Sequence, residues 1–91
     1  MRFVYGASFS RSLKKLHPNQ KEALDQALMV LIKNSAAGEE KRGDLVGIFV
    51  LKFRSNKVEW LLAYRIVSKK EIALLVVGPH ENFYRDLKTS I

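Results

Sequence analysis

The chain has 91 residues, of which 47% are hydrophobic and 27% are charged, a balance typical of one folded domain rather than a disordered tail. It has no cysteine, which excludes disulfides and thiolate zinc sites, and its two histidines are too few for a typical metal cage. The net charge of +7 predicts affinity for polyanions or for an acidic protein partner.

No membrane or export segment is expected. The longest apolar runs, Leu45–Leu51 and Ala27–Ile32, fall far short of the roughly 20 residues that a membrane span requires. The N-terminal Met1–Gly6 lacks the apolar region and the cleavage site of a secretory signal. We therefore expect a cytoplasmic protein of one domain, residues 1–91, without membrane association, metal or cofactor.

The first half of the chain predicts a strand followed by a helical hairpin. Phe3–Phe9 is a plausible edge strand, and Ser10 can cap a short helix that runs to Leu16. Pro18 costs no hydrogen bond in the first turn of a helix, so it favours the start of a second helix. That helix carries one apolar stripe and ends near two stop signals. The stripe is Leu24, Ala27, Leu28, Leu31 and Ile32, and the stop signals are Asn34 and Gly38.

The second half changes to the period of β-strands. Asp44–Ser55, Val58–Ser68 and Glu71–Gly78 are rich in Val, Ile, Phe and Leu and are separated by short polar turns. Such connections indicate sequential antiparallel strands. Glu81–Lys88 then predicts a short final helix. The expected fold is α+β in the order β-α-α-β-β-β-α, with the helical hairpin packed on one face of a small antiparallel sheet.

Alternation along the strands predicts a charged cluster on the other face of the sheet. Phe49, Leu51 and Phe53 share one face with Trp60, Leu62, Tyr64 and Ile66. If the helices cover this aromatic face, four charged side chains stand together on the open face: Lys52, Arg54, Glu59 and Arg65. They can bind phosphate groups and stabilise charge during phosphoryl transfer. They can equally form an ordinary solvated surface.

The segment Trp60–Ile66, an apolar strand, and then Gly78–Lys88 resemble the RelE/ParE superfamily, the toxins of bacterial type II toxin–antitoxin modules. The likeness covers nearly the whole chain in length and element order, although only the last third carries recognisable motif. The pattern acidic-Trp-x-Leu-x-Tyr-Arg, followed by Gly-x-His, looks most like the YafQ branch of ribosome-dependent mRNA endonucleases.

The resemblance implies a set of site residues. Glu59 and His80 match acidic and histidine positions of the YafQ active site, and Tyr84 matches an aromatic one. Arg65 is added as a phosphate-stabilising catalytic residue, and Lys52, Arg54 and Lys57 as RNA-binding residues. Metal-independent cleavage needs a base for the 2′-hydroxyl and an acid for the 5′-oxygen, roles that His80 and Glu59 suit.

Three departures leave the set incomplete. Ser55 stands where the YafQ pattern has a further histidine, and Leu61 aligns with an arginine of RelE. A second upstream histidine of that pattern has no counterpart, since His17 lies in the helical hairpin. Structural roles are also open for the residues that match: His80 as a helix cap, Glu59 in a cross-strand ion pair, and Phe83 and Tyr84 in docking the last helix. Of these two aromatic residues, Tyr84 is the better candidate to face solvent. His17 is assigned no role.

The leading hypothesis is an mRNA endonuclease toxin that acts at the ribosome and leaves a 2′,3′-cyclic phosphate. The alternatives are a toxin that inhibits DNA gyrase, and an inactive relative that only binds nucleic acid. The resemblance also implies a cognate antitoxin, an acidic protein with a DNA-binding domain that binds the basic surface of the toxin.

Overall fold

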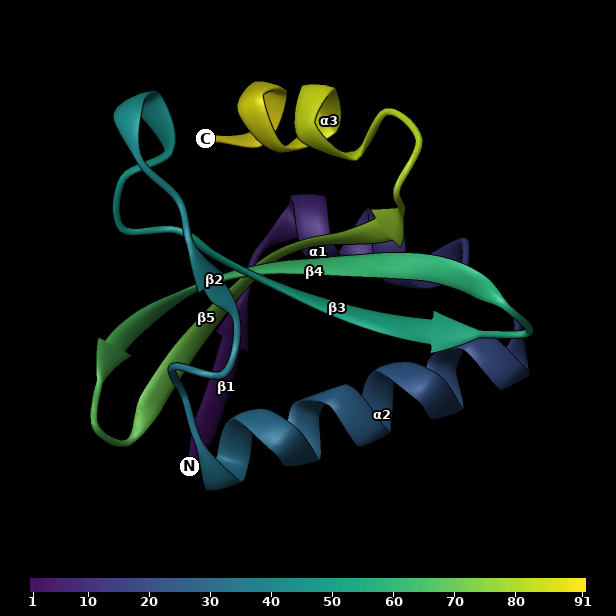
Figure 1. Ribbon diagram of the computed structural model, residues 1–91, viewed down its shortest axis with the longest axis horizontal. Helices are drawn as coiled ribbons and strands as arrows, with labels where there is room; N and C mark the ends of the chain where they lie inside the picture. The colour runs from purple at the N-terminus through teal and green to yellow at the C-terminus, as the bar shows by residue number, and fades with distance from the viewer.

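The computed structural model describes residues 1–91 and has a five-stranded sheet with helices on both faces (Figure 1). None of its helices combines the length and the apolar character that crossing a membrane requires. In chain order the elements are β1 (Arg2–Tyr5), α1 (Ala7–Lys14), α2 (Pro18–Lys33), β2 (Glu39–Glu40), the 3-10 turn η1 (Gly43–Leu45), β3 (Phe49–Ser55), β4 (Val58–Ser68), β5 (Glu71–Pro79) and α3 (Phe83–Ser90).

The strands lie in the order β1-β5-β4-β3-β2. The antiparallel meander β3-β4-β5 and the edge position of β1 confirm the predictions. β1, however, pairs with β5 in parallel, so the sheet is mixed rather than wholly antiparallel. A parallel pair needs a long crossover, and here the two helices and three other strands separate β1 from β5 along the chain.

The first strand is shorter than predicted, because the chain turns into α1 directly after Tyr5. Gly6 is the extended N-cap of α1, and its carbonyl accepts a hydrogen bond from the Ser10 N–H at 3.1 Å. Ser10 therefore lies inside the helix rather than capping it. The second helix begins at Pro18 as predicted, and the His17 N–H donates to the Gln20 Oε1 at 2.9 Å.

The apolar stripe of α2 is core at Leu24, Ala27 and Leu31, whereas Ile32 is exposed. The strand predicted to begin at Asp44 begins at Phe49 instead. Gly43 and Gly47 adopt φ values of +68° and +83°, a left-handed conformation that interrupts the extended chain before β3.

The hairpin between β3 and β4 fixes which residues face each other. Asn56 and Lys57 form its two-residue loop, with φ values of 50° and 68°. Positive φ at both positions matches the tight turns that follow the twist of the flanking strands. The resulting register places Arg54 opposite Glu59 and Lys52 opposite Leu61.

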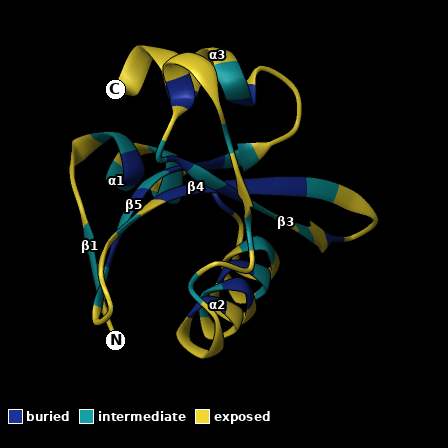
Figure 2. Ribbon diagram, turned by 60° about the vertical axis from the view of Figure 1, so that its left-hand side comes forward, coloured by how far each residue is buried: buried dark blue, intermediate teal, exposed yellow.

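Each face of the sheet has its own hydrophobic cluster. On one face, α1 and α2 cover a cluster that includes Trp60, Leu62 and Tyr64. On the other face, Phe83 and Leu87 of α3 pack in a cluster with Leu61 and Ala63 (Figure 2). The face expected to be open is therefore covered over its middle by α3.

The outer edge of β3 is mostly unpaired. β2 has two residues and pairs only with Phe49 and Val50. The backbone groups of residues 51–55 that point away from β4 consequently have no partner strand.

Candidate nucleic-acid interface

Three of the predicted residues lie side by side across three strands. Arg54 on β3 faces Glu59 on β4. The His80 N–H, directly after β5, donates to the Glu59 carbonyl oxygen at 3.3 Å. Strand alternation directs these three side chains to the α3 side of the sheet, together with Lys52. The structure thus brings two cations, a carboxylate and an imidazole to one end of one face.

Helix α3 adds Tyr84 to this group. Phe83 is 1% exposed and holds the start of the helix against the sheet, whereas Tyr84 is half-buried. The Tyr84 ring lies edge-on to the His80 ring, with centroids 6.5 Å apart. The expectation that Tyr84, rather than Phe83, faces solvent is confirmed.

A further cation, Lys41, was not predicted from the sequence. Its ammonium lies 5.3 Å from the centre of the Tyr84 ring and forms an ion pair with Glu39. The hydrogen bond from Lys41 lowers the pKa of Glu39, and the same bond, with the nearby Tyr84 hydroxyl, raises the pKa of Lys41. The charge of Lys52 also lowers the Glu39 pKa, which places Lys52 in the same electrostatic neighbourhood.

A buried tyrosine holds the segment that carries Lys41. Tyr64 is fully buried, and its hydroxyl donates to the Ser35 carbonyl oxygen at 2.8 Å and accepts from the Gly38 N–H at 2.9 Å. Burial raises the pKa of this hydroxyl. Downstream, the Lys41 N–H donates to the Ile48 carbonyl oxygen at 2.8 Å. These contacts link residues far apart in sequence. The sequence near Lys41 shows only a run of charged residues, which does not by itself predict a place in the site.

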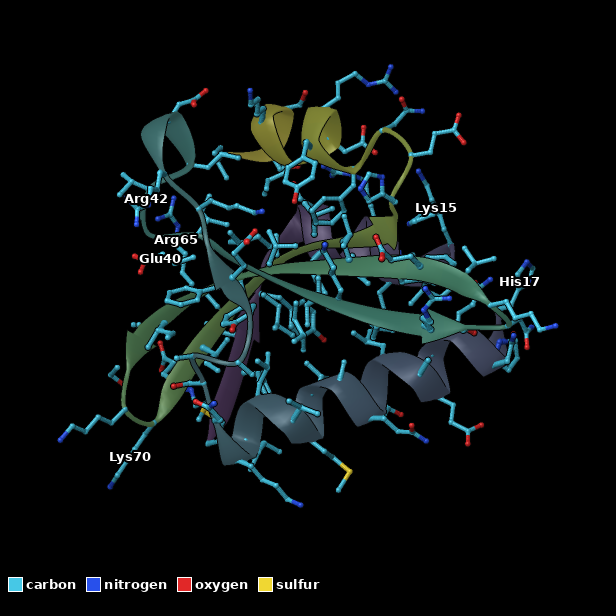
Figure 3. The ribbon with its side chains drawn as sticks, in the orientation of Figure 1. Lys15, His17, Glu40, Arg42, Arg65 and Lys70 are labelled. Atoms are coloured by element: carbon cyan, nitrogen blue, oxygen red, sulfur yellow. The ribbon has the colours of Figure 1, made fainter.

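The structure does not bring Arg65 to this group. Arg65 lies on the same face as Glu59, but six residues along β4 correspond to about 20 Å. Its guanidinium lies beside Gly47, 3.3 Å from the position that a Cβ atom there would occupy. Figure 3 shows Arg65 close to Arg42 and Glu40, at the opposite end of the sheet from His17. Strand parity fixes the face of a residue but not its distance along the strand.

The remaining predicted positions are explained by their places in the sheet. Lys57 is exposed in the hairpin loop at the same end as Arg54 and Glu59. Ser55 points to the α2 side, where the Asn19 side chain donates to its hydroxyl at 3.5 Å. Leu61 is fully buried. Neither Ser55 nor Leu61 contributes a polar group to the site.

The arrangement can bind a phosphodiester. Lys52 and Arg54 come from β3 and Lys57 from the loop that follows it, whereas Lys41 follows β2 near the start of β3, and its ammonium reaches the ring of Tyr84 on α3. An imidazole and a carboxylate on neighbouring strands, next to bound phosphate, are the groups that proton transfer at a ribose hydroxyl needs.

Two solved structures are similar to this chain. One is a chain of the intact E. coli RelBE toxin–antitoxin complex, with a TM-score of 0.70, 18% identity, and coverage of 88% of this chain and 96% of that chain. The other is an arginine-to-alanine double mutant of E. coli toxin RelE in the free state, with a TM-score of 0.74, 16% identity, and coverage of 98% and 90%. At these identities the likeness shows the fold, which is RelE-like. No curated protein matches the chain in sequence.

The sequence itself matches one family over residues 4–88, nearly its whole length, and that family is described as the ParE-like toxin of type II bacterial toxin–antitoxin systems. The match includes the end of β1, the helical hairpin, the other strands and most of α3, and it agrees with the fold of the similar structures. The chain therefore belongs to the ParE-like toxins of bacterial type II toxin–antitoxin systems.

Proposed function

We propose that this toxin is an endonuclease that cleaves mRNA at the ribosome by internal phosphoryl transfer. The observation that carries the proposal is the row of Arg54, Glu59 and His80 across β3, β4 and the end of β5, with Tyr84 beside His80. In this reaction the ribose 2′-oxygen bonds to the adjacent phosphorus and the bond to the 5′-oxygen breaks. The products are a 2′,3′-cyclic phosphate and a free 5′-hydroxyl.

Each group has a role that its place supports. Lys52 and Arg54 bind the scissile phosphate and offset the negative charge that grows on its oxygens. Glu59 accepts the proton of the 2′-hydroxyl, and His80 donates a proton to the departing 5′-oxygen. Tyr84 stacks on a base or hydrogen-bonds the phosphate, with Lys41 adding charge beside it. Lys57 extends the cationic surface along the backbone of the RNA. Arg65 is too far along β4 to share this phosphate and has no part in the proposal.

The partner that we propose for the toxin is a cognate antitoxin with an acidic segment and a DNA-binding domain. A net charge of +7 attracts such a segment, and a similar chain was solved in a toxin–antitoxin complex. A small reading frame beside the gene, whose product restores growth when it is co-expressed, is the expected finding.

The test is cleavage of a translated mRNA in a reconstituted translation reaction, with fragment ends mapped and their phosphates identified. His80→Ala should lower the cleavage rate by about 10²–10⁴-fold, the usual contribution of a proton-transfer group. Lys52→Ala with Arg54→Ala should also abolish most cleavage. The matched control is Lys69→Ala with Lys70→Ala, two cations in the β4–β5 turn at the far end of the sheet (Figure 3). Growth arrest of cells that express the toxin, with their transcripts intact, would contradict the nuclease proposal.

Inhibition of DNA gyrase is the second candidate, because the matching family is named for ParE and because Leu61 replaces an arginine of RelE. A gyrase inhibitor acts by binding and needs no imidazole. It predicts DNA breaks, an SOS response and toxicity that survives His80→Ala, so one variant separates the two candidates.

A further inference from the structure

A groove lies beside the loop that carries His80. It has a volume of about 520 Å³, within the usual range of small-ligand sites, and lies between α1, the end of β5 and α3. Its apolar surface includes Trp60, Val77 and Phe83, and its cationic side chains are Arg11, Lys15 and Arg85. None of these cations belongs to the Arg54–Glu59–His80 row.

Trp60 lines the groove and has a hydrogen-bond donor without a partner. The side chain is 8% exposed, and its indole Nε1 is buried without any partner in the protein. A buried N–H without an acceptor costs free energy, since it loses water and gains nothing in return. A ligand that brings an acceptor to the indole would remove that cost.

The charge of the groove favours an anionic ligand. Asp86 lies 3.9 Å from the Arg85 Nε in an exposed pair, whereas Arg11 on α1 and Lys15 at its C-cap have no carboxylate within ion-pair distance. The other carboxylate of the groove, Glu81, likewise forms no ion pair. Lys15, labelled in Figure 3, projects on the side where the chain passes from β5 into α3.

The groove is continuous along the chain with the proposed cleavage site. Pro79, Glu81 and Asn82 line it, while His80 between them stands beside Glu59 on the α3 side. A single RNA strand whose scissile phosphate lies at His80 can therefore place a neighbouring nucleotide here. Aromatic surfaces next to a cationic rim are typical of sites for single-stranded nucleic acid.

We propose that this groove binds a nucleotide of single-stranded RNA that flanks the scissile phosphodiester. The base lies against Trp60 and accepts a hydrogen bond from its indole N–H, and a flanking phosphate contacts Arg11 and Lys15. The inference rests on the proposed nuclease function, to which it adds a subsite that selects the neighbouring nucleotide.

The experiment uses the intrinsic fluorescence of Trp60, the only tryptophan of the chain. The full-length toxin is titrated with a 2′-O-methyl RNA tetranucleotide, which lacks the attacking hydroxyl. Saturable change in fluorescence is expected, and Arg11→Ala with Lys15→Ala should raise the Kd at least tenfold, roughly the effect of losing one charge-assisted hydrogen bond. Lys69→Ala with Lys70→Ala is the matched control and should leave the Kd unchanged.

Further variants separate the subsite from the cleavage site. Lys52→Ala with Arg54→Ala should abolish mRNA cleavage and keep the fluorescence response to a mononucleotide such as UMP. Trp60→Phe, checked for folding by thermal melting, should weaken binding of a dye-labelled tetranucleotide and change base preference, because a smaller aromatic ring remains and the N–H is lost.

Two results would overturn the proposal while the nuclease stands: cleaved mRNA with no response of Trp60 to bound oligonucleotide, or full activity of the Arg11 and Lys15 double variant. A response to an acidic peptide such as polyglutamate, with none to RNA, would also overturn it and make the groove a peptide site. Conversely, a saturable Trp60 response to RNA without any mRNA cleavage would remove the nuclease and with it the role of the groove beside a scissile phosphodiester, and would leave the groove as a site that only binds RNA.

Discussion

The Lys41 ammonium lies 5.3 Å from the centre of the Tyr84 ring, a contact between the chain that follows β2 and the first turn of α3. It makes Lys41 part of the proposed site. Lys41→Met should lower mRNA cleavage about tenfold or more, since a hydrogen bond to a charged group contributes roughly 1.5–3 kcal/mol. Single-turnover cleavage measures the effect. Lys70→Met, at the far end of the sheet, is the control, and equal rates for the two variants would remove Lys41 from the site.

Leu61 takes the position of a RelE arginine, so this chain has no arginine at that position. It lies fully buried in the cluster that Phe83 and Leu87 form with the sheet. Leu61→Arg, which restores the residue type of RelE, should destabilise the fold by at least about 3 kcal/mol, because it buries a charge with no partner. Urea unfolding measures the loss, with Leu61→Met as the volume-matched control. A stable and more active Leu61→Arg variant would show that α3 moves aside.

Gly38 is needed where the loop passes Tyr64. A Cβ atom at this position would lie 2.8 Å from the Tyr64 hydroxyl oxygen and 2.9 Å from the Val50 carbonyl oxygen. Gly38→Ala should therefore lower the free energy of unfolding by about 1–3 kcal/mol, as overpacking does. Gly6→Ser is the control, because a Cβ there meets nothing within 4 Å and serine is a favoured N-cap. Chemical denaturation of the two variants decides the point.

The Tyr64 hydroxyl should make stability fall at alkaline pH. Burial raises its pKa above 10.0 in the folded protein, so the folded state keeps this proton longer than the unfolded state does. Its contribution is fully present below about pH 10 and is lost as pH rises through the folded pKa. Tyr64→Phe should remove this part of the pH dependence. Unfolding curves measured from pH 8 to pH 11 test it, and an unchanged slope in the variant would contradict the assignment.

The sheet was largely predictable, because its signals are local. Val58–Ser68 was predicted at its observed bounds, since apolar alternation runs between two polar turns. Alternation also placed Lys52, Arg54 and Glu59 on one face. β2 was missed, because two consecutive glutamates carry no strand pattern and pair with β3 only in the folded chain.

The site was predictable only in part. Strand alternation gives the face on which a side chain lies, but neither its distance along the strand nor the position of residues in loops. Arg65 shares a face with Glu59 yet lies at the other end of β4. Lys41 joins the site because Tyr64, distant in sequence, anchors the loop before it. Helix α3 covers the second face through Phe83 and Leu87. Their spacing of four residues is found both in helices that pack on a sheet and in helices that do not, so the sequence did not predict this contact.

The short β2 has a consequence for the behaviour of the toxin in solution. Residues 51–55 of β3 present an unpaired backbone edge on which another chain can add a strand, the contact through which sheets of separate molecules associate. Lys52 and Arg54 stand on this edge, and like charges repel a second copy. The two cations proposed to bind phosphate therefore also oppose self-association. The variant with Lys52→Ala and Arg54→Ala should precipitate at a lower protein concentration than the wild type.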